Sequence, residues 1–200
     1  MKKYLLLLSL LILQFGNVYA QKNNVKILEN SYQKGFITKG KDSIYYQKVF
    51  FKAFPSNFQS FSKIYAWNDL TNKGYPLNDV ALDHINHFFA LKCINEDEFI
   101  KKIIYISING VDQADGISFF QNNLIQYVPL HNKEFVEILK TFSTKQIVSV
   151  WTFYFDYENS FIRKDKYHEI VKLTSAINKS MIPLITTGYQ KSSKNWKEGH

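Results

Sequence analysis

Two histidines three residues apart, His84 and His87, are the residues whose types and spacing best suit metal chemistry. On a helix this spacing places both imidazoles on one side, with Asp83 next to them. A zinc site needs a third protein ligand, and the sequence has neither an H-E-x-x-H motif nor a cluster of cysteines and histidines. We therefore predict no metal and no other cofactor, and we expect both histidines on the polar side of an amphipathic helix, solvated or hydrogen-bonded.

Two acidic residues, Asp112 and Asp115, have the types required for glycoside hydrolysis by paired carboxylates. Such a pair requires one carboxyl whose pKa is raised by an apolar cleft, and a separation of about 5 to 9.5 Å between the two groups. Both residues precede an apolar stretch of helical period, where carboxylates cap free N–H groups and complement the helix dipole. We therefore predict that Asp112 caps this helix and that Asp115 lies in its first turn.

The single cysteine, Cys93, raises the question of a Cys/His dyad with His84 or His87, as in many cell-wall amidases and peptidases. Those enzymes place the cysteine at a helix N-terminus, where its pKa is lowered, whereas Cys93 falls at the C-terminal end of a predicted helix. This position favours a buried, small hydrophobic residue. Because the sequence also lacks a nucleophile elbow, a phosphate-binding glycine loop and an EF-hand loop, we predict no catalytic residues and a protein that is not an enzyme.

The first twenty residues have the pattern of a cleavable signal peptide. Lys2 and Lys3 precede an apolar run from Tyr4 to Phe15, and Val18-Tyr19-Ala20 supplies small residues at the cleavage site. The run is shorter than the roughly 20 apolar residues of a membrane-spanning helix. Gln21 follows the cleavage site, where a lipoprotein has a cysteine. We therefore expect a mature protein without a membrane anchor, periplasmic or secreted.

The mature chain is basic, but its charge does not indicate nucleic-acid binding. The whole sequence has 25 lysines and arginines against 17 acids, and removing the first twenty residues takes away two lysines, which leaves 23 against 17. Arg163 is the only arginine, and the lysines are spread along the chain. Because groove reading and phosphate recognition rely heavily on arginine, we exclude nucleic acid and assign the charge to solubility or to an acidic partner.

The remaining chain is a series of apolar stretches, mostly of helical period, separated by turn residues. Asn95 with Glu98 and Ser143 with Gln146 have the spacing of helix caps. The stretch from Val148 to Phe155 is also compatible with a buried strand, because β-branched and aromatic residues dominate it. The cap at Ser143 favours a helix. The helices are expected over 42–53, 58–65, 76–93, 95–108, 112–129, 132–142, 143–155 and 165–177.

These elements predict a mainly all-α fold. Short turns join consecutive helices, so we expect antiparallel helical hairpins layered into a compact or slightly solenoidal bundle. The expected organisation is a signal peptide over 1–20, a polar and loosely ordered lead-in over 21–41, a single helical domain over 42–190 and a mobile tail over 191–200.

Two polar connections are candidate binding sites for another protein. The segment from Trp67 to Tyr75 is rich in turn residues, and Asn109-Gly110 can end the preceding helix in a left-handed conformation. Both connections combine hydrogen-bonding groups with exposure, and Trp67 adds an aromatic anchor. The alternative is that both are ordinary connections. The predicted partner-binding residues are Trp67, Asn68, Asp69, Tyr75, Asn109, Asp112, Gln113 and Asp115.

Three segments carry a resemblance to a known group of proteins: FFKAFPSNF at 50–58, ISINGVDQAD at 106–115 and VWTFYFD at 150–156. Together they resemble a family of small exported helical bacterial proteins that are encoded near antibacterial toxins. The resemblance spans about residues 45 to 175 and brings no catalytic motif. It implies an immunity protein that occludes the active site of a cognate effector acting in the periplasm, for example one that degrades cell wall. The alternatives are an exported cell-wall or glycan hydrolase and a protein that binds an envelope polymer.

Overall fold

The computed structural model of the chain describes residues 23–156 and 159–198, so the expected signal peptide over 1–20 lies outside the described residues. The described chain divides after Phe54 into two compact units. Unit 1 comprises residues 23–54, and unit 2 comprises residues 55–198. This division falls within the single domain expected over 42–190, and the helical residues 23–37 before that range belong to unit 1.

Unit 1 is a helical hairpin. Residues 23–32 form a helix that continues into the π-helix η1 (Gln33–Ile37), and α2 (Ser43–Ala53) returns alongside. The rings of Phe36 and Phe50 meet edge to face, with centroids 5.3 Å apart. The Asn24 side-chain amide donates to the Ala53 carbonyl at 3.0 Å. The expected loosely ordered lead-in is therefore wrong for residues 23–37, which form regular helical structure.

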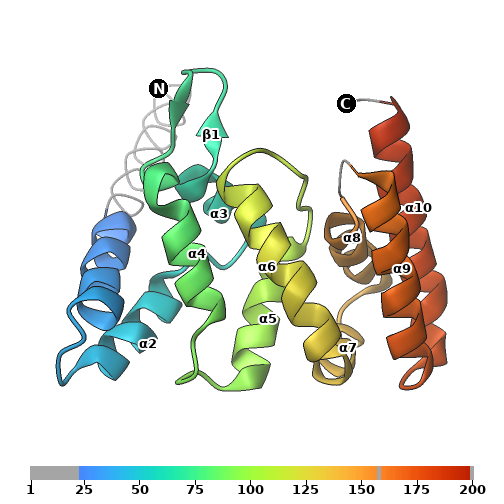
Figure 1. The fold of residues 1–200 in the computed structure, drawn as a ribbon, viewed down its shortest axis with the longest axis horizontal. Coiled ribbons are helices and arrows are strands. Elements are labelled where there is room, and N and C mark those ends of the chain that lie inside the picture. The colour runs from blue at the N-terminus through green and yellow to red at the C-terminus, as the bar shows by residue number, and fades with distance from the viewer. Residues whose placement is uncertain (1–22, 157–158, 199–200) are drawn as a thin grey trace, which may run out of the picture. The chain divides into compact units, whose positions relative to one another are not determined.

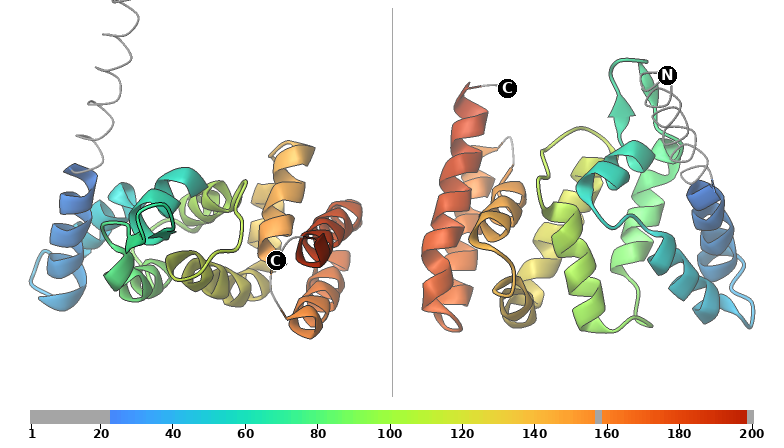
Figure 2. Two further views of the ribbon diagram at one scale, coloured as in Figure 1. Left: turned by 90° about the horizontal axis from the view of Figure 1, so that it is seen from above. Right: turned by 180° about the vertical axis from the view of Figure 1, so that it is seen from behind.

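Unit 2 consists of helices and one short β-hairpin, which confirms the all-α fold class (Figures 1 and 2). Within the described residues, no helix is both long and apolar enough to cross a membrane. The elements of unit 2, in chain order, are α3 (Phe58–Tyr65), β1 (Trp67–Asn68), β2 (Lys73–Gly74), η2 (Asn78–Val80), α4 (Ala81–Phe89), α5 (Glu96–Ser107), α6 (Gly116–Leu130), α7 (Asn132–Leu139), α8 (Thr144–Tyr154), α9 (Ser160–Ser175), η3 (Lys179–Met181) and α10 (Ile182–Glu198).

Two predicted caps are present and explain where their helices begin. The Asn95 side chain accepts a hydrogen bond from the Glu98 backbone N–H at the start of α5. Ser143 and Gln146 form a reciprocal capping box at the start of α8. The stretch from Val148 to Tyr154 is accordingly helical, and the strand alternative is excluded.

Several predicted boundaries are wrong. Asp112 does not cap α6, which begins at Gly116 and continues through Pro129 to Leu130. Asn159, rather than Asp165, caps α9. The expected tail from residue 191 belongs to α10 as far as residue 198, and Ser192 within it is fully buried.

The helices of unit 2 pack mainly with partners that are not their neighbours in sequence. The most extensive contacts are those of α8 with α10, α4 with α6, and α5 with α7, while α9 and α10 form an antiparallel pair (Figure 1). Gly188 allows α10 to approach α8 closely, because a Cβ there would lie only 2.5 Å from the Trp151 Cβ. Together the helices enclose an aromatic core that includes Phe61, Phe120 and Trp151.

Candidate partner-binding surface

The segment from Trp67 to Tyr75 forms a small hairpin. Trp67 pairs with Gly74 and Asn68 pairs with Lys73 in an antiparallel register. At the tip, the Asn68 side chain accepts a hydrogen bond from the Leu70 N–H at 3.1 Å. This segment was expected to be an irregular loop, and the backbone pairing gives it a defined conformation.

The hairpin presents apolar side chains to solvent. Leu70 at its tip is 98% exposed and Trp67 is 41% exposed. Tyr75, by contrast, is half-buried, and its backbone N–H donates to the Ala66 carbonyl at 2.9 Å. Trp67 and Leu70 are therefore the side chains of the hairpin best placed to contact another molecule.

The second candidate segment, the connection from Asn109 to Asp115, is held by hydrogen bonds to α8 and its C-terminal end. Asn109 has the expected left-handed conformation, with φ of 59°, and its N–H donates to the Ser149 hydroxyl at 2.7 Å. The Asp112 N–H donates to a carboxylate oxygen of buried Asp156 at 2.9 Å. Val111 between them is 46% exposed. The connection is thus anchored at two points and presents an apolar side chain between them.

The hairpin and this connection lie at the same end of unit 2 (Figures 1 and 2). Partly buried contacts hold their bases together. The Asn78 side-chain amide donates to the Tyr65 carbonyl at 3.0 Å and approaches Asp115 Oδ2 at 3.5 Å. Gly116 packs against the same carbonyl so closely that a Cβ on it would lie 2.4 Å from the oxygen. We define residues 67–74 and 109–115 together as the apical surface.

A buried pair of side chains, Tyr65 and His84, lies beneath the hairpin. The Tyr65 hydroxyl and the His84 Nδ1 share a hydrogen bond of 3.2 Å. Burial lowers the pKa of His84 to about 4, against the opposing effect of Asp83 and with a smaller contribution from His87. Burial likewise raises the pKa of Tyr65 well above its ordinary value. Both groups are therefore neutral at pH 7 and act as a polar contact inside the core.

The structure places the predicted partner-binding residues in two different roles. Trp67, Asp69, Asn109 and Gln113 are exposed on the apical surface. Asp112 and Asp115 are half-buried. The Ser118 hydroxyl lies 3.5 Å from a carboxylate oxygen of Asp112, and the Asn78 side-chain amide lies 3.5 Å from a carboxylate oxygen of Asp115. Asn68 is half-buried and shapes the hairpin tip. The exposed members are suited to recognition, and the half-buried members position them.

The residues considered for metal binding or catalysis differ in burial and do not form a common site. His84 is only 2% exposed, so its predicted place on the polar side of the helix is wrong. His87 is half-buried, and its Nδ1 lies 2.9 Å from the Asp83 carbonyl. Cys93 is half-buried in the connection after α4. In the part of the chain that the structure describes, no three His, Cys, Asp or Glu side chains gather in a manner suited to a metal ion.

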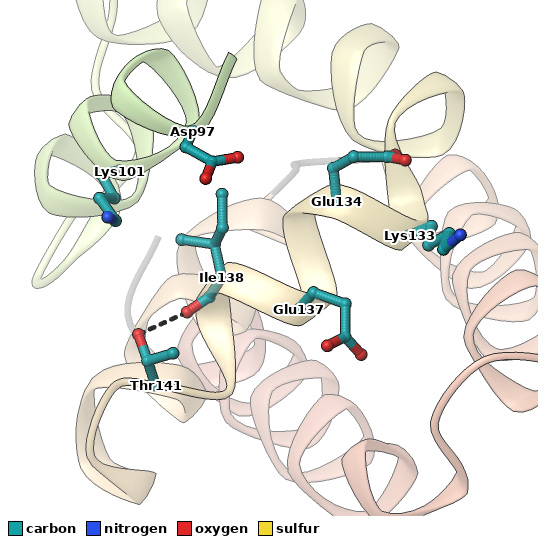
Figure 3. A pocket seen from close by; sticks show the side chains of 7 residues that line it. All are labelled: Asp97, Lys101, Lys133, Glu134, Glu137, Ile138 and Thr141. Atoms are coloured by element: carbon teal, nitrogen blue, oxygen red, sulfur yellow. Dashed lines mark hydrogen bonds between the residues drawn. The ribbon is translucent and has the colours of Figure 1, made fainter. Parts of the chain in front are cut away.

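A charged groove lies between α5 and α7 (Figure 3). Its volume is about 410 Å³, and Asp97 on one wall faces Glu134 and Glu137 on the other, with two lysines at the edges. Glu137 is ion-paired with Lys140. This mixture of opposite charges favours a solvated, ion-paired surface over a site for a charged ligand.

Sequence reasoning missed the residues that organise and extend the apical surface. Leu70 was hidden among turn residues, and only its place at a hairpin tip makes it prominent. Asn78 and Gly116 both contact the Tyr65 carbonyl, and these contacts join positions that are distant in sequence, 13 residues apart for Asn78 and Tyr65. The sequence did contain a signal for a hairpin. The turn residues Asn68, Asp69, Asn72 and Gly74 lie close together here, and the apolar residues Trp67 and Leu70 lie among them.

Comparison of the chain with models of protein families, with curated proteins and with solved structures finds no match.

Proposed function

We propose that this protein is a non-enzymatic, exported binding protein, and that it acts as an immunity factor. It binds a cognate antibacterial effector that acts in the periplasm, such as a cell-wall-degrading enzyme, and occludes that effector's active site. The apical surface makes the contact. The mature protein is periplasmic or secreted and has neither a membrane anchor nor a nucleic-acid partner.

The observation that carries this proposal is the exposure of Leu70 on an ordered hairpin. A fully exposed leucine at a tip whose backbone is paired and hydrogen-bonded loses little conformational entropy when a partner covers it. Trp67, on the same hairpin, is of the residue type most enriched among the residues that dominate binding energy. Polar groups on the neighbouring connection supply the hydrogen-bonding rim that such interfaces have.

Binding to an envelope polymer is the rival from a different class. It would rest on lysines scattered along the chain, and such attraction weakens strongly between about 50 and 500 mM salt because screening shortens to a few ångströms. A packed contact through Trp67 and Leu70 persists over that range. Salt dependence therefore separates a packed protein contact from attraction of a polymer by the scattered lysines.

The test is a pull-down with the mature protein against the product of each adjacent gene, followed by calorimetry on any captured pair. Leu70→Ser and Trp67→Ala are expected to weaken binding by about tenfold or more each. The matched control is Leu130→Ser, because Leu130 is 81% exposed at the opposite end of α6 from the apical surface. This control should bind as the unchanged protein does.

Protection of cells that express the captured effector in their periplasm is the second readout. We expect the unchanged protein to protect and Leu70→Ser to protect less. Capture of no adjacent gene product, together with no protection, would refute the immunity function. Lysis of purified cell wall by the mature protein alone would instead support the hydrolase alternative.

A further inference from the structure

A second groove in unit 2, distinct from the charged groove between α5 and α7, is lined only by uncharged residues. Its volume is about 490 Å³, within the range typical of small-molecule sites. It lies where the N-termini of α3 and α8 meet the C-terminal end of α5. The lining residues are Asn57, Phe58, Gln59, Tyr105, Ile108, Asn109 and Gln146.

The groove concentrates primary amides, and two of them are fixed in place by the fold. The Asn57 oxygen accepts from the Ser60 N–H at 2.9 Å, and the Gln146 oxygen accepts from the Ser143 N–H at 3.1 Å. Each amide therefore uses its oxygen to cap a helix. Its NH₂ group makes no hydrogen bond to any other described residue and remains a donor for a ligand.

Two further amides, Gln59 and Asn109, add both donors and acceptors. Gln59 is exposed in the first turn of α3, and Asn109 is exposed at the end of α5. The hydrogen bond from the Asn109 N–H to Ser149 fixes the backbone that carries this side chain. Four amides from three parts of the chain thus surround one groove.

An aromatic ring completes the groove. Tyr105 is 47% exposed, and Phe142 contacts its ring edge to face at a centroid distance of 5.2 Å. This contact orients the Tyr105 ring and leaves part of it accessible to a ligand. Phe58, half-buried, is held against Phe153 at 5.9 Å.

We propose that this groove binds a neutral sugar unit of a glycan. Sugar hydroxyls both donate and accept hydrogen bonds, which matches amides, and the apolar C–H face of a pyranose packs on an aromatic ring such as Tyr105. A nucleotide would also stack on Tyr105, but it brings a phosphate, and none of the seven lining residues is a cation. The groove shares Asn109 with the apical surface, but Gln59 and Tyr105 lie outside that surface, so the inference does not rest on the protein partner proposed above.

The test is a titration of the isotopically labelled mature protein with the neutral trisaccharide of N-acetylglucosamine, followed by NMR of side-chain amide signals. We expect saturable shifts of the Gln59, Asn109 and Gln146 NH₂ signals. Tyr105→Ala should weaken binding by about tenfold or more. The control is Tyr45→Ala, because Tyr45 is an exposed tyrosine of α2 in unit 1, and it should bind as the unchanged protein does.

Circular dichroism establishes that each variant is folded, and Gln59→Ala provides a second variant that leaves the aromatic residues intact. We expect Gln59→Ala to weaken binding without changing the helical signal. Absence of saturable shifts, equal binding by the Tyr45 and Tyr105 variants, or saturable shifts of the same signals with adenosine in place of the trisaccharide would overturn the proposal.

Discussion

Acidification should destabilise this protein through a single buried histidine, His84. In the folded protein its pKa is about 4, and in the unfolded chain it returns to 6.5. As the pH falls through 6.5, the unfolded state takes up a proton that the folded state does not bind. The contribution of His84 to stability is therefore fully present above pH 6.5 and is lost progressively between pH 6.5 and about pH 4.

The size of the effect follows from the same two pKa values. Each unit of difference corresponds to about 1.4 kcal/mol, so the separation between 6.5 and about 4 predicts a loss of about 3 kcal/mol. His84 is only 2% exposed, so solvent screening reduces this figure little. A loss of this size is a large fraction of the roughly 5 to 15 kcal/mol by which domains are stable.

The assay is urea unfolding of the unchanged protein and of His84→Gln at a series of pH values from 7 to 4, followed by circular dichroism. Subtracting the two curves removes the titration of every other group, so the difference should change by about 3 kcal/mol over this range. His168→Gln is the control, because His168 is exposed on α9 and does not contribute to the pKa shift of His84, and its curve should follow the unchanged protein. Parallel curves for the unchanged protein and His84→Gln would refute the reasoning.

Three substitutions test the packing and the caps of unit 2 by thermal and urea unfolding. Gly188→Ala should destabilise the protein by about 1 to 2 kcal/mol, because the 2.5 Å approach to Trp151 outweighs the roughly 1 kcal/mol that alanine adds to helix propensity. The control, Gln190→Ala on the exposed side of α10, should not destabilise it. Equal stability of the two variants would contradict the close approach. Gln121→Leu should cost about 1 to 3 kcal/mol, because two buried backbone carbonyls, each 2.7 Å from its amide nitrogen, lose their donor; an unchanged unfolding midpoint would mean that these bonds contribute nothing. Ser143→Ala should cost about 1 kcal/mol through loss of the capping box, and a stability equal to that of the unchanged protein would show that the start of α8 does not need it.

Local sequence determined most of the secondary structure of this protein, since the interactions that begin a helix span only a few residues. Asn95 caps α5 and the Ser143–Gln146 pair caps α8, as their spacing predicts. The α8 cap also settled the choice between helix and strand for a stretch rich in β-branched and aromatic residues. The left-handed turn at Asn109 was equally local, because asparagine tolerates that conformation better than most residues.

The predicted helix boundaries were wrong where more than one residue could cap the same helix. Asp112 and Asp115 both precede α6, and the side chain that caps the helix cannot be chosen without knowing where the chain turns. Asp112 instead gives its N–H to Asp156, 44 residues away, and the helix begins later. Similarly, the polar residues before position 42 concealed a helix whose apolar side packs on α2.

Tertiary structure alone decided which side chains are buried together and which remain available. The sequence indicated two candidate loops, but Asn78, Tyr65 and Gly116 bring them to one end of unit 2 through contacts between distant positions. Burial of His84 and the gathering of four amides around one groove are equally non-local. Periodicity and caps act over one or two helical turns, whereas these features depend on how whole helices pack, and that is the physical reason they could be read only from the folded chain.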